Sequence, residues 1–531
     1  MQLVAYGAQD VFLTGTPEIT YWKVSYRRHT NFAMESIEQT FSGQADFGRR
    51  VTCTISRNGD LAYRTYLQVT LPEINQDMKP SGADVGVYAR WLDFIGEQLI
   101  AQVEVEIGGQ RIDRHYGDWM HIWNQLTLSS EQQKGYFKMI GHTTQLTYIT
   151  DPSFDDVSGP CAASGGPAQV CAPRKTLPET TLYIPLLFWF CRNPGLALPL
   201  IALQYHEVKI NIDFRPIGEC LWAVKTLSQS GSGTVSVSTA YQQSLVAASL
   251  YVDYIFLDTD ERRKMAQNPH EYLIEQLQFT GDESVGSSSN KIKLNFNHPC
   301  KELIWVVQPD ANVDYCSSLD SASVLFRTLG AQPFNYTDAI DALPPAIHAF
   351  GGQVETSGAG AFINASGLFQ MAGATDASGL TVGNDWGTTT PFTTSTVTGS
   401  SLSDAGTFVL AETALDMHCW GENPVVTAKL QLNGQDRFTE REGSYFDVVQ
   451  PYQHHTRHPD TGINVYSFAL RPEEHQPSGS CNFSRIDNAV LQLVLPSPTV
   501  SGTATAKVRV YAVNYNVVRI MSGMAGVAYS N

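Results

Sequence analysis

The chain has 531 residues and a formal net charge of −17, with 35 lysine and arginine residues against 52 aspartate and glutamate residues. It therefore lacks the basic excess that phosphate neutralisation requires, and we expect no direct contact with nucleic acid. Hydrophobic residues make up 43% of the chain and aromatic residues 11%, which is enough for two full cores.

The N-terminal sequence MQLVAYGAQDVFL lacks the charged start and long apolar core of a signal peptide. No apolar stretch reaches the roughly 18 residues of a membrane-spanning helix, so we expect a soluble protein that is made in the cytosol. The nine cysteines include no Cys-x-x-Cys pair, and buried free thiols are expected in a reducing compartment. Cys161 and Cys171 share one loop and form the one pair suspected of a disulfide.

Five sequence blocks recur in the same order in the two halves of the chain. In chain order the matches are Ile37–Gln39 with Ile274–Gln276, Val51–Leu61 with Ile292–Leu303, Val105–Trp119 with Leu430–Phe446, the run around Arg192 with that around Arg471, and the strand from Leu250 with that from Val510. A repeat of this length indicates two tandem domains rather than a solenoid, whose units have roughly 20 to 50 residues. Residues 27–257 and 270–519 are therefore predicted to share one strand order.

Alternating apolar and polar residues predict half-buried antiparallel strands in each half, as in AQVEVEI (residues 101–107) and EVKINIDF (residues 207–214). Hairpin turns are predicted at Asn58-Gly59, Gly108-Gly109 and Asn433-Gly434, because these residues adopt the positive φ angles of a type I′ turn.

Short helices are expected between the strands. Asp118 is a candidate cap for a helix with Trp119, Ile122, Trp123 and Leu126 on one face, and Ser444 takes the same place in the second half. Between the halves, residues 258–261 form a capping box for a connector helix that ends before Pro269.

Offsets between matched residues locate two insertions. Leu61 and Leu303 are 242 positions apart but Gln110 and Gln435 are 325 apart, so the second half has gained about 83 residues. The offset from Arg192 to Arg471 is 279, which leaves about 46 extra residues in the first half. Because a closed core cannot bury a polar insertion, the segment from Val324 to Leu410 is expected to project outward.

The predicted fold is all-β, with two tandem eight-stranded jelly-roll β-sandwiches, short helices and long loops. The expected organisation is an N-terminal arm (1–26), a first jelly roll (27–257), a connector helix (258–269) and a second jelly roll (270–531) with a loop insertion at about 324–410 and a tail at about 519–531. The arm and tail have no counterpart in the other half, so we expect them at the inner base, outside either core.

Five separated blocks, at residues 7–32, 55–61, 258–281, 295–308 and 514–531, resemble the major capsid proteins of nucleocytoplasmic large DNA viruses, particularly those of algal viruses and iridoviruses. The resemblance implies a double jelly roll and a homotrimer whose six jelly rolls mimic a hexagon. Such capsomers tile the icosahedral shell of a large double-stranded DNA virus over an internal membrane. The implied partners are other copies, minor capsid proteins and the penton protein, in a virion assembled in the host cytoplasm.

The sequence lacks the motifs of an enzyme, and we expect no catalytic residue, metal or cofactor. A cupin metal site needs His-x-His, which is absent, as are Gly-x-Ser-x-Gly, P-loop and His-Glu-x-x-His motifs. His454, His455 and His458 come nearest to ligand spacing, but they lie between Pro451 and Pro459, and a solvated loop is predicted. The alternative function is a glycan-binding jelly-roll spike or a receptor-binding virion protein.

Two sets of residues are candidate sites. Sequons for glycosylation lie at Asn335, Asn364 and Asn482. Compact basic clusters lie at Arg27 and Arg28 and at Arg262, Arg263 and Lys264. These clusters either form ordinary surface ion pairs or contact acidic minor capsid proteins or lipid headgroups at the inner face.

Overall fold

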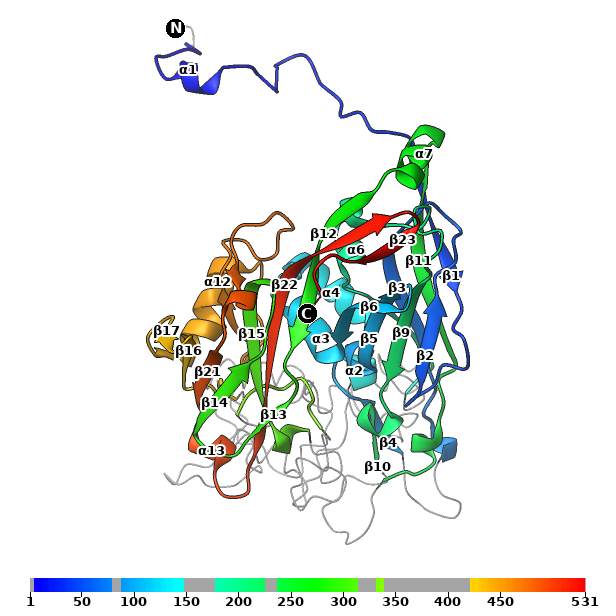
Figure 1. Cartoon of the computed structure of the whole chain (residues 1–531). Coiled ribbons are helices and arrows are strands. Elements are labelled where there is room, and N and C mark those ends of the chain that lie inside the picture. The colour runs from blue at the N-terminus through cyan, green and yellow to red at the C-terminus, as the bar shows by residue number, and fades with distance from the viewer. Residues whose placement is uncertain are drawn as a thin grey trace.

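The computed structural model describes residues 4–78, 87–147, 177–224, 236–313, 331–338 and 421–530. Figure 1 shows two β-sandwiches side by side, with an N-terminal arm that extends from one end. The predicted insertions fall largely on residues 148–176, 314–330 and 339–420, which lie outside the described residues. The expected outward projection of Val324–Leu410 and the state of Cys161 and Cys171 therefore stay predictions.

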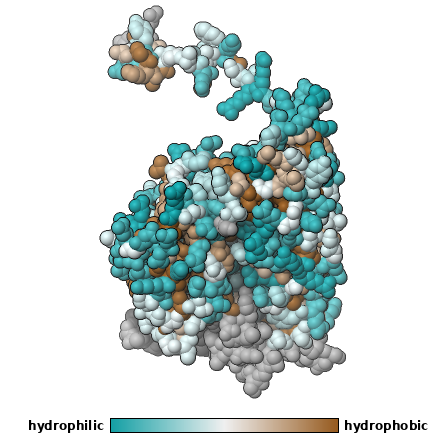
Figure 2. Space-filling model, viewed as in Figure 1, coloured by the Kyte–Doolittle hydropathy of each residue, from teal (hydrophilic) through white to brown (hydrophobic). Residues whose placement is uncertain are grey.

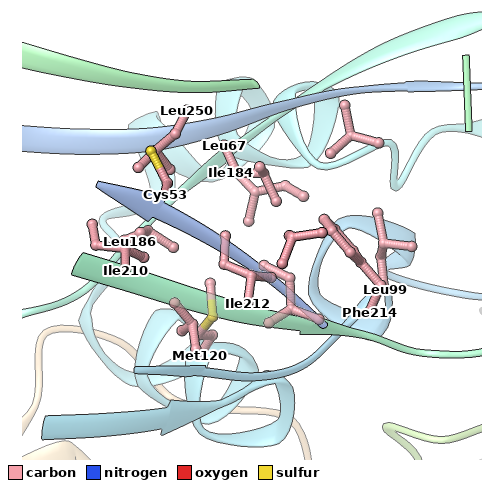
Figure 3. Close-up of a cluster of buried hydrophobic side chains, with 14 of the residues drawn as sticks. Cys53, Leu67, Leu99, Met120, Ile184, Leu186, Ile210, Ile212, Phe214 and Leu250 are labelled. Carbon is pink, nitrogen blue, oxygen red and sulfur yellow. The ribbon is translucent and has the colours of Figure 1, made fainter. Parts of the chain in front are cut away.

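The first half is a sandwich of two antiparallel sheets. One sheet has the order β1 (Phe32–Gln39), β11 (Ala247–Leu257), β3 (Leu61–Leu71) and β7 (Thr180–Pro185). The other has the order β2 (Arg50–Thr54), β9 (Val208–Phe214), β5 (Ile100–Ile107) and β6 (Gln110–Tyr116). Alternate residues of both sheets face inward, and Figure 3 shows Leu67, Ile184 and Leu250 of the first sheet opposite Cys53, Ile210 and Ile212 of the second.

The second half repeats this arrangement. One sheet has the order β12 (His270–Phe279), β22 (Ala506–Met521), β15 (Pro299–Pro309) and β19 (Asn464–Ser467). The other has the order β14 (Ser289–Leu294), β21 (Ala489–Val494), β16 (Thr427–Leu432) and β17 (Gln435–Asp436). Taken in chain order, the strands of the two halves occupy the same places. The predicted double jelly roll with one shared strand order is confirmed.

Two of the three predicted hairpin turns are confirmed. Gly108 and Gly109 have φ angles of 58° and 84° and join β5 to β6, and Asn433 and Gly434, at 52° and 78°, join β16 to β17. The prediction at Asn58-Gly59 is wrong, because β2 pairs with β9 and β3 pairs with β11, so the chain crosses between sheets there. Gly59 instead provides space, since a Cβ atom there would lie 2.7 Å from Cβ of Tyr254.

The predicted helices form, but two of their caps differ from expectation. α3 (Gly117–Thr127) begins after Tyr116, so Asp118 lies in its first turn and does not cap it. A π-helical turn, η7 (Tyr445–Val449), follows Ser444, whose side chain makes no capping bond, and continues into α12 (Gln450–His454). Between the halves, α7 (Thr259–Gln267) is capped by the side chain of Asp258.

The remaining elements are short. They are α1 (Asp10–Leu13), η1 (Gln76–Met78), β4 (Tyr88–Trp91), α2 (Ile95–Gln98), α4 (Ser130–Met139), α5 (Thr144–Thr147), α6 (Trp189–Arg192), η3 (Pro194–Leu196), β8 (Leu198–Pro199), η4 (Ile217–Glu219), β10 (Leu221–Val224), η5 (Ala240–Gln242), β13 (Glu283–Val285), η6 (Asp310–Asn312), β18 (Arg441–Glu442), β20 (Cys481–Asn482), η8 (Phe483–Arg485), α13 (Ser497–Val500) and β23 (Met524–Val527). No helix in the described part of the chain is long and apolar enough to cross a membrane.

The C-terminal tail departs from the expected position outside the cores. β23 folds back on the end of β22, pairing Val518 with Val527. Val518, Ile520 and Ala525 are buried in the core cluster of the first jelly roll. The tail is therefore part of that core, because its apolar residues find a partner surface on the other half of the chain.

The cysteines of the described segments are free thiols, as predicted. Cys53, Cys191, Cys220 and Cys300 are buried and Cys481 is half-buried. Burial raises the pKa of Cys53 to about 11, so this thiol stays protonated and packs as a small apolar side chain.

Candidate assembly surfaces

The two jelly rolls are joined by an apolar layer that lies outside the two sandwich cores. The α3 helix of the first jelly roll contributes four side chains that are only 0 to 4% exposed: Trp119, Ile122, Trp123 and Leu126. They pack on the outer face of the β12–β22–β15–β19 sheet. The sheet contributes Ile304, Val306, Val465, Tyr511 and Val513 to this layer. The predicted one-sided helix is confirmed, and its apolar side binds the other half of the chain.

An ion-pair chain lies beside this layer. Asp118 Oδ2 of α3 is 3.1 Å from Arg509 Nη1 of β22, and Arg509 Nε donates to Asp282 Oδ1 at 2.8 Å. Burial alone would lower the pKa of Arg509, but Asp118 and Asp282 outweigh it and raise this pKa. The Asp118–Arg509 ion pair therefore links α3 of the first jelly roll to β22 of the second.

A second set of charges crosses the boundary at Glu275 of β12. Lys301 Nζ, on a fully buried side chain, is 2.6 Å from Glu275 Oε1, and Arg192 Nη2 of the first jelly roll is 3.1 Å from Glu275 Oε2. The Arg192 guanidinium also lies 4.6 Å from the ring centroid of Trp123. Burial lowers the pKa of Lys301, and Glu275 opposes that shift. The Glu275 carboxylate therefore binds one cation from each half of the chain.

The structure corrects the prediction of a solvated histidine loop. His455 Nε2 is 2.9 Å from Glu302 Oε2 and its Nδ1 is 2.9 Å from Glu473 Oε1, on a buried side chain. Burial would lower the pKa of His455, but the two carboxylates raise it to about 9. Both ring nitrogens are engaged, while His454 is half-buried and His458 is exposed. Among the residues described, no cluster of three or more metal-ligating side chains occurs.

The N-terminal arm exposes apolar side chains that no part of the described chain covers. They are 71 to 97% exposed: Val4, Tyr6, Val11, Phe12, Leu13, Ile19, Tyr21, Trp22, Val24 and Tyr26. Figure 2 shows the arm standing clear of the body with apolar atoms at its far end. Arg27 and Arg28, where the arm approaches β1, are also exposed. Exposed apolar groups of this extent mark an interaction surface.

The second basic cluster lies on α7, at the end of the molecule from which the arm emerges (Figure 1). Arg262 Nε is 3.0 Å from Asp60 Oδ1, so this side chain holds α7 to the first jelly roll. Arg263 and Lys264 are exposed. Their contact with partners stays a prediction.

The sequons occupy different environments. Asn335 is half-buried, and its Nδ2 donates to Gln332 Oε1 at 2.7 Å while its Oδ1 accepts from Thr337 N at 3.0 Å. Asn482 is exposed, although its Oδ1 accepts from Ser484 N at 3.1 Å. Asn364 lies outside the described residues. Of the two described sites, Asn482 has the more accessible side chain.

The sequence reasoning missed the charges at the domain boundary. Lys301 and Glu302 interrupt the apolar run that continues as LIWVV in β15, and both are fully buried. A charged pair inside an apolar strand was the available signal, since such residues are buried only when they have partners. Their partners, Glu275 and His455, are too distant in sequence to be identified by spacing.

The chain is similar to known proteins along most of its length. The family model for the large eukaryotic DNA virus major capsid protein matches residues 261–526, and that for the major capsid protein N-terminus matches residues 20–258. The major capsid protein of Phaeocystis pouchetii virus is 76% identical, covering 100% of this chain and 99% of that protein. A chain of the PBCV-1 virus capsid has a TM-score of 0.61 at 33% identity, covering 96% of this chain and 100% of that chain. The Faustovirus major capsid protein, at 12% identity and a TM-score of 0.60 over 97% of this chain and 94% of that one, shares the fold.

Proposed function

Because the chain belongs to the family of major capsid proteins of large eukaryotic DNA viruses, we propose that this virion structural protein works as a homotrimeric capsomer that tiles an icosahedral shell. The observation that carries the proposal is the pair of jelly rolls with one strand order, held side by side by the α3 layer. Three such chains around a threefold axis present six similar units. Their near-hexagonal outline packs edge to edge over a flat face.

The contact between chains follows from this symmetry. A closed threefold ring uses a heterologous interface, in which the second jelly roll of one chain meets the first jelly roll of the next. An obligate interface of this kind buries more than about 2,000 Å² in total. A ring that closes in this way does not grow into a filament.

The arm and the exposed cations suit contacts beyond the trimer. The N-terminal arm emerges at the end of the molecule where α7 lies (Figure 1). Arg27 and Arg28 end the arm, and Arg263 and Lys264 belong to α7. We assign this end to the inner side of the shell, where minor capsid proteins and an internal membrane offer acidic or lipid surfaces. The penton protein is the expected neighbour at the vertices, and assembly takes place in the host cytoplasm.

The proposed role is structural, without enzymatic activity and without direct contact with the genome. The chain's charge of −17 opposes binding to phosphate backbones.

Mass photometry or sedimentation of the purified full chain at micromolar concentration tests the trimer directly. The expected result is a single species with three times the chain mass of 58.4 kDa. A stable monomer would overturn the capsomer and favour the glycan-binding spike or receptor-binding protein instead.

A further inference from the structure

The helix that joins the two jelly rolls has a counterpart on the far side of the second one. Residues 117–126 read GDWMHIWNQL, and residues 443–452 read GSYFDVVQPY. Both segments follow the turn-linked strand pair of their own half, β5–β6 or β16–β17. Met120 and Phe446, at matching positions, are fully buried in their own sandwich cores. The two helices are therefore anchored in the same way.

Their outward faces differ sharply in exposure. Ile122, Trp123 and Leu126 are 0, 4 and 0% exposed, because they pack on the second jelly roll. The matching residues, Val448, Val449 and Tyr452, are 46, 38 and 86% exposed. Figure 1 places α12 on the side of the second jelly roll that faces away from the first. The second helix thus carries the same apolar face without its partner.

The matching acceptor is also open. In the second jelly roll, α3 covers the outer face of β15, β19 and β22. The equivalent strands of the first jelly roll are β3, β7 and β11, and on their outer face Tyr66 stacks on Tyr251 at 5.3 Å and contacts Tyr183 at 6.2 Å between ring centroids. Tyr183 is 40% exposed, and the other two rings are partly exposed. One tyrosine therefore comes from each of the three strands that the helix would cover.

We propose that Val448, Val449 and Tyr452 of one copy pack on the Tyr66–Tyr183–Tyr251 face of the next copy, so that the contact within the chain is repeated between chains. This inference rests on the proposed trimer and names the surface that closes it. The trimer would then contain six similar helix-on-sheet contacts, three within chains and three between chains. The tyrosines suit a surface that is wet before assembly and buried after it, since their rings are apolar and their hydroxyl groups are not.

The test replaces the exposed helix face in the full-length protein. The double variant Val448→Asp and Tyr452→Asp should weaken trimer formation at least about 100-fold in sedimentation, the effect expected when central interface residues are lost. Far-ultraviolet circular dichroism should match the wild type, because both side chains are exposed in the free chain. The matched control is Phe12→Asp on the arm, which removes an apolar side chain that is 90% exposed and should leave the trimer intact.

A second measurement covers the case in which the double variant does not fold. Tyr452→Cys is combined in turn with Tyr66→Cys, Tyr183→Cys or Tyr251→Cys, and a short bis-maleimide reagent should link neighbouring chains in at least one combination but not in Tyr452→Cys alone. The inference is overturned if the aspartate double variant stays trimeric, or if none of the three cysteine pairs gives a link in folded trimers. Either result leaves the proposed capsomer standing. A monomeric wild type overturns the capsomer itself.

Discussion

At the scale of single residues, the second jelly roll buries charged side chains close to its boundary with the first. Lys301 and Glu302 are adjacent on β15, and each is fully buried with a partner of opposite charge: Glu275 for the lysine and His455 for the glutamate. A buried ion pair contributes little net stability compared with an apolar pair of the same shape, but loss of one partner is costly. These residues therefore fix how the segments meet more than they add to the free energy of folding.

The His455 cluster predicts a fall in stability at alkaline pH. Its pKa is about 9 in the folded chain against 6.5 for an ordinary histidine, so the contribution is complete below pH 6.5 and is lost as the pH rises through 9. The free energy of unfolding should fall by on the order of 3 kcal/mol across this window. Chemical denaturation of the wild type and His455→Gln at fixed protein concentration measures it.

The variant separates this residue from other groups that titrate in the same range. His455→Gln should be less stable than the wild type at pH 6.5, because Glu302 stays buried without a cation, and its pH dependence should be flatter. The neighbouring His454→Gln is the control and should keep the wild-type slope. Parallel pH profiles for the wild type and His455→Gln would refute the assignment.

At the scale of elements, the repeated hairpin was predictable because its turn chemistry is local. Gly108-Gly109 and Asn433-Gly434 both adopt positive φ angles and place the following helix at the same point of each jelly roll. Asn58-Gly59 is the same dipeptide as Asn433-Gly434, but neither of its residues has a positive φ angle. There, Tyr254 donates a hydrogen bond from its hydroxyl group to the carbonyl oxygen of Ser56 at 2.6 Å, and its ring packs over Gly59. Tertiary packing thus decided the role of that glycine.

The two glycines should respond differently to asparagine. Gly109→Asn should cost less than about 1 kcal/mol, because asparagine tolerates a positive φ and nothing lies within 4 Å of a Cβ atom there. Gly59→Asn should cost about 1–3 kcal/mol, because its Cβ atom would clash with Tyr254. Equilibrium unfolding of both variants gives the comparison, and equal losses would contradict the assigned roles.

The C-terminal hairpin shows why element positions were harder to predict than element types. The strand from Val510 was expected, but nothing local in RIMSGMAG indicates that its apolar residues pack on the other half of the chain. The same holds for α3, whose apolar face was predicted from spacing while its partner sheet was not. Asp118 was predicted to cap α3 but lies in its first turn, where it pairs with Arg509 of the second jelly roll.

Two neighbouring residues of β22 test this packing across the halves. Ile520 is 1% exposed in the core of the first jelly roll, whereas Met521 is 50% exposed. Ile520→Ala should destabilise the chain by about 2–5 kcal/mol, and Met521→Ala should change stability by less than 1 kcal/mol, about the size of a surface substitution. Hydrogen exchange should show the loss of protection in the first jelly roll as well as in β22. A loss confined to the second jelly roll would refute the shared core.

At the scale of the whole molecule, the duplication explains the fold and motivates the proposed assembly. Collinear sequence echoes were sufficient to predict two domains with one shared strand order, because the repeated blocks follow one another in the same order in both halves. They were not sufficient to predict which surfaces meet, because the helix faces at Ile122 and Val448 occupy matching positions in the repeat, yet the first is 0% exposed and the second 46% exposed. Exposure in the folded structure separates the joint within the chain from the one proposed between chains.

The arm belongs to this same scale, since it has no counterpart in the repeat and contributes no side chain to either core cluster among the residues described. Deleting residues 1–26 should therefore leave the trimer intact in mass photometry. It should weaken attachment to minor capsid proteins, because the exposed apolar and aromatic side chains of the arm are removed. Electron microscopy of particles formed with those proteins measures shell integrity. The variant Phe12→Ser with Trp22→Ser keeps the backbone of the arm and should reproduce most of the loss. Complete, stable shells from the deleted protein would show that the arm has no part in assembly.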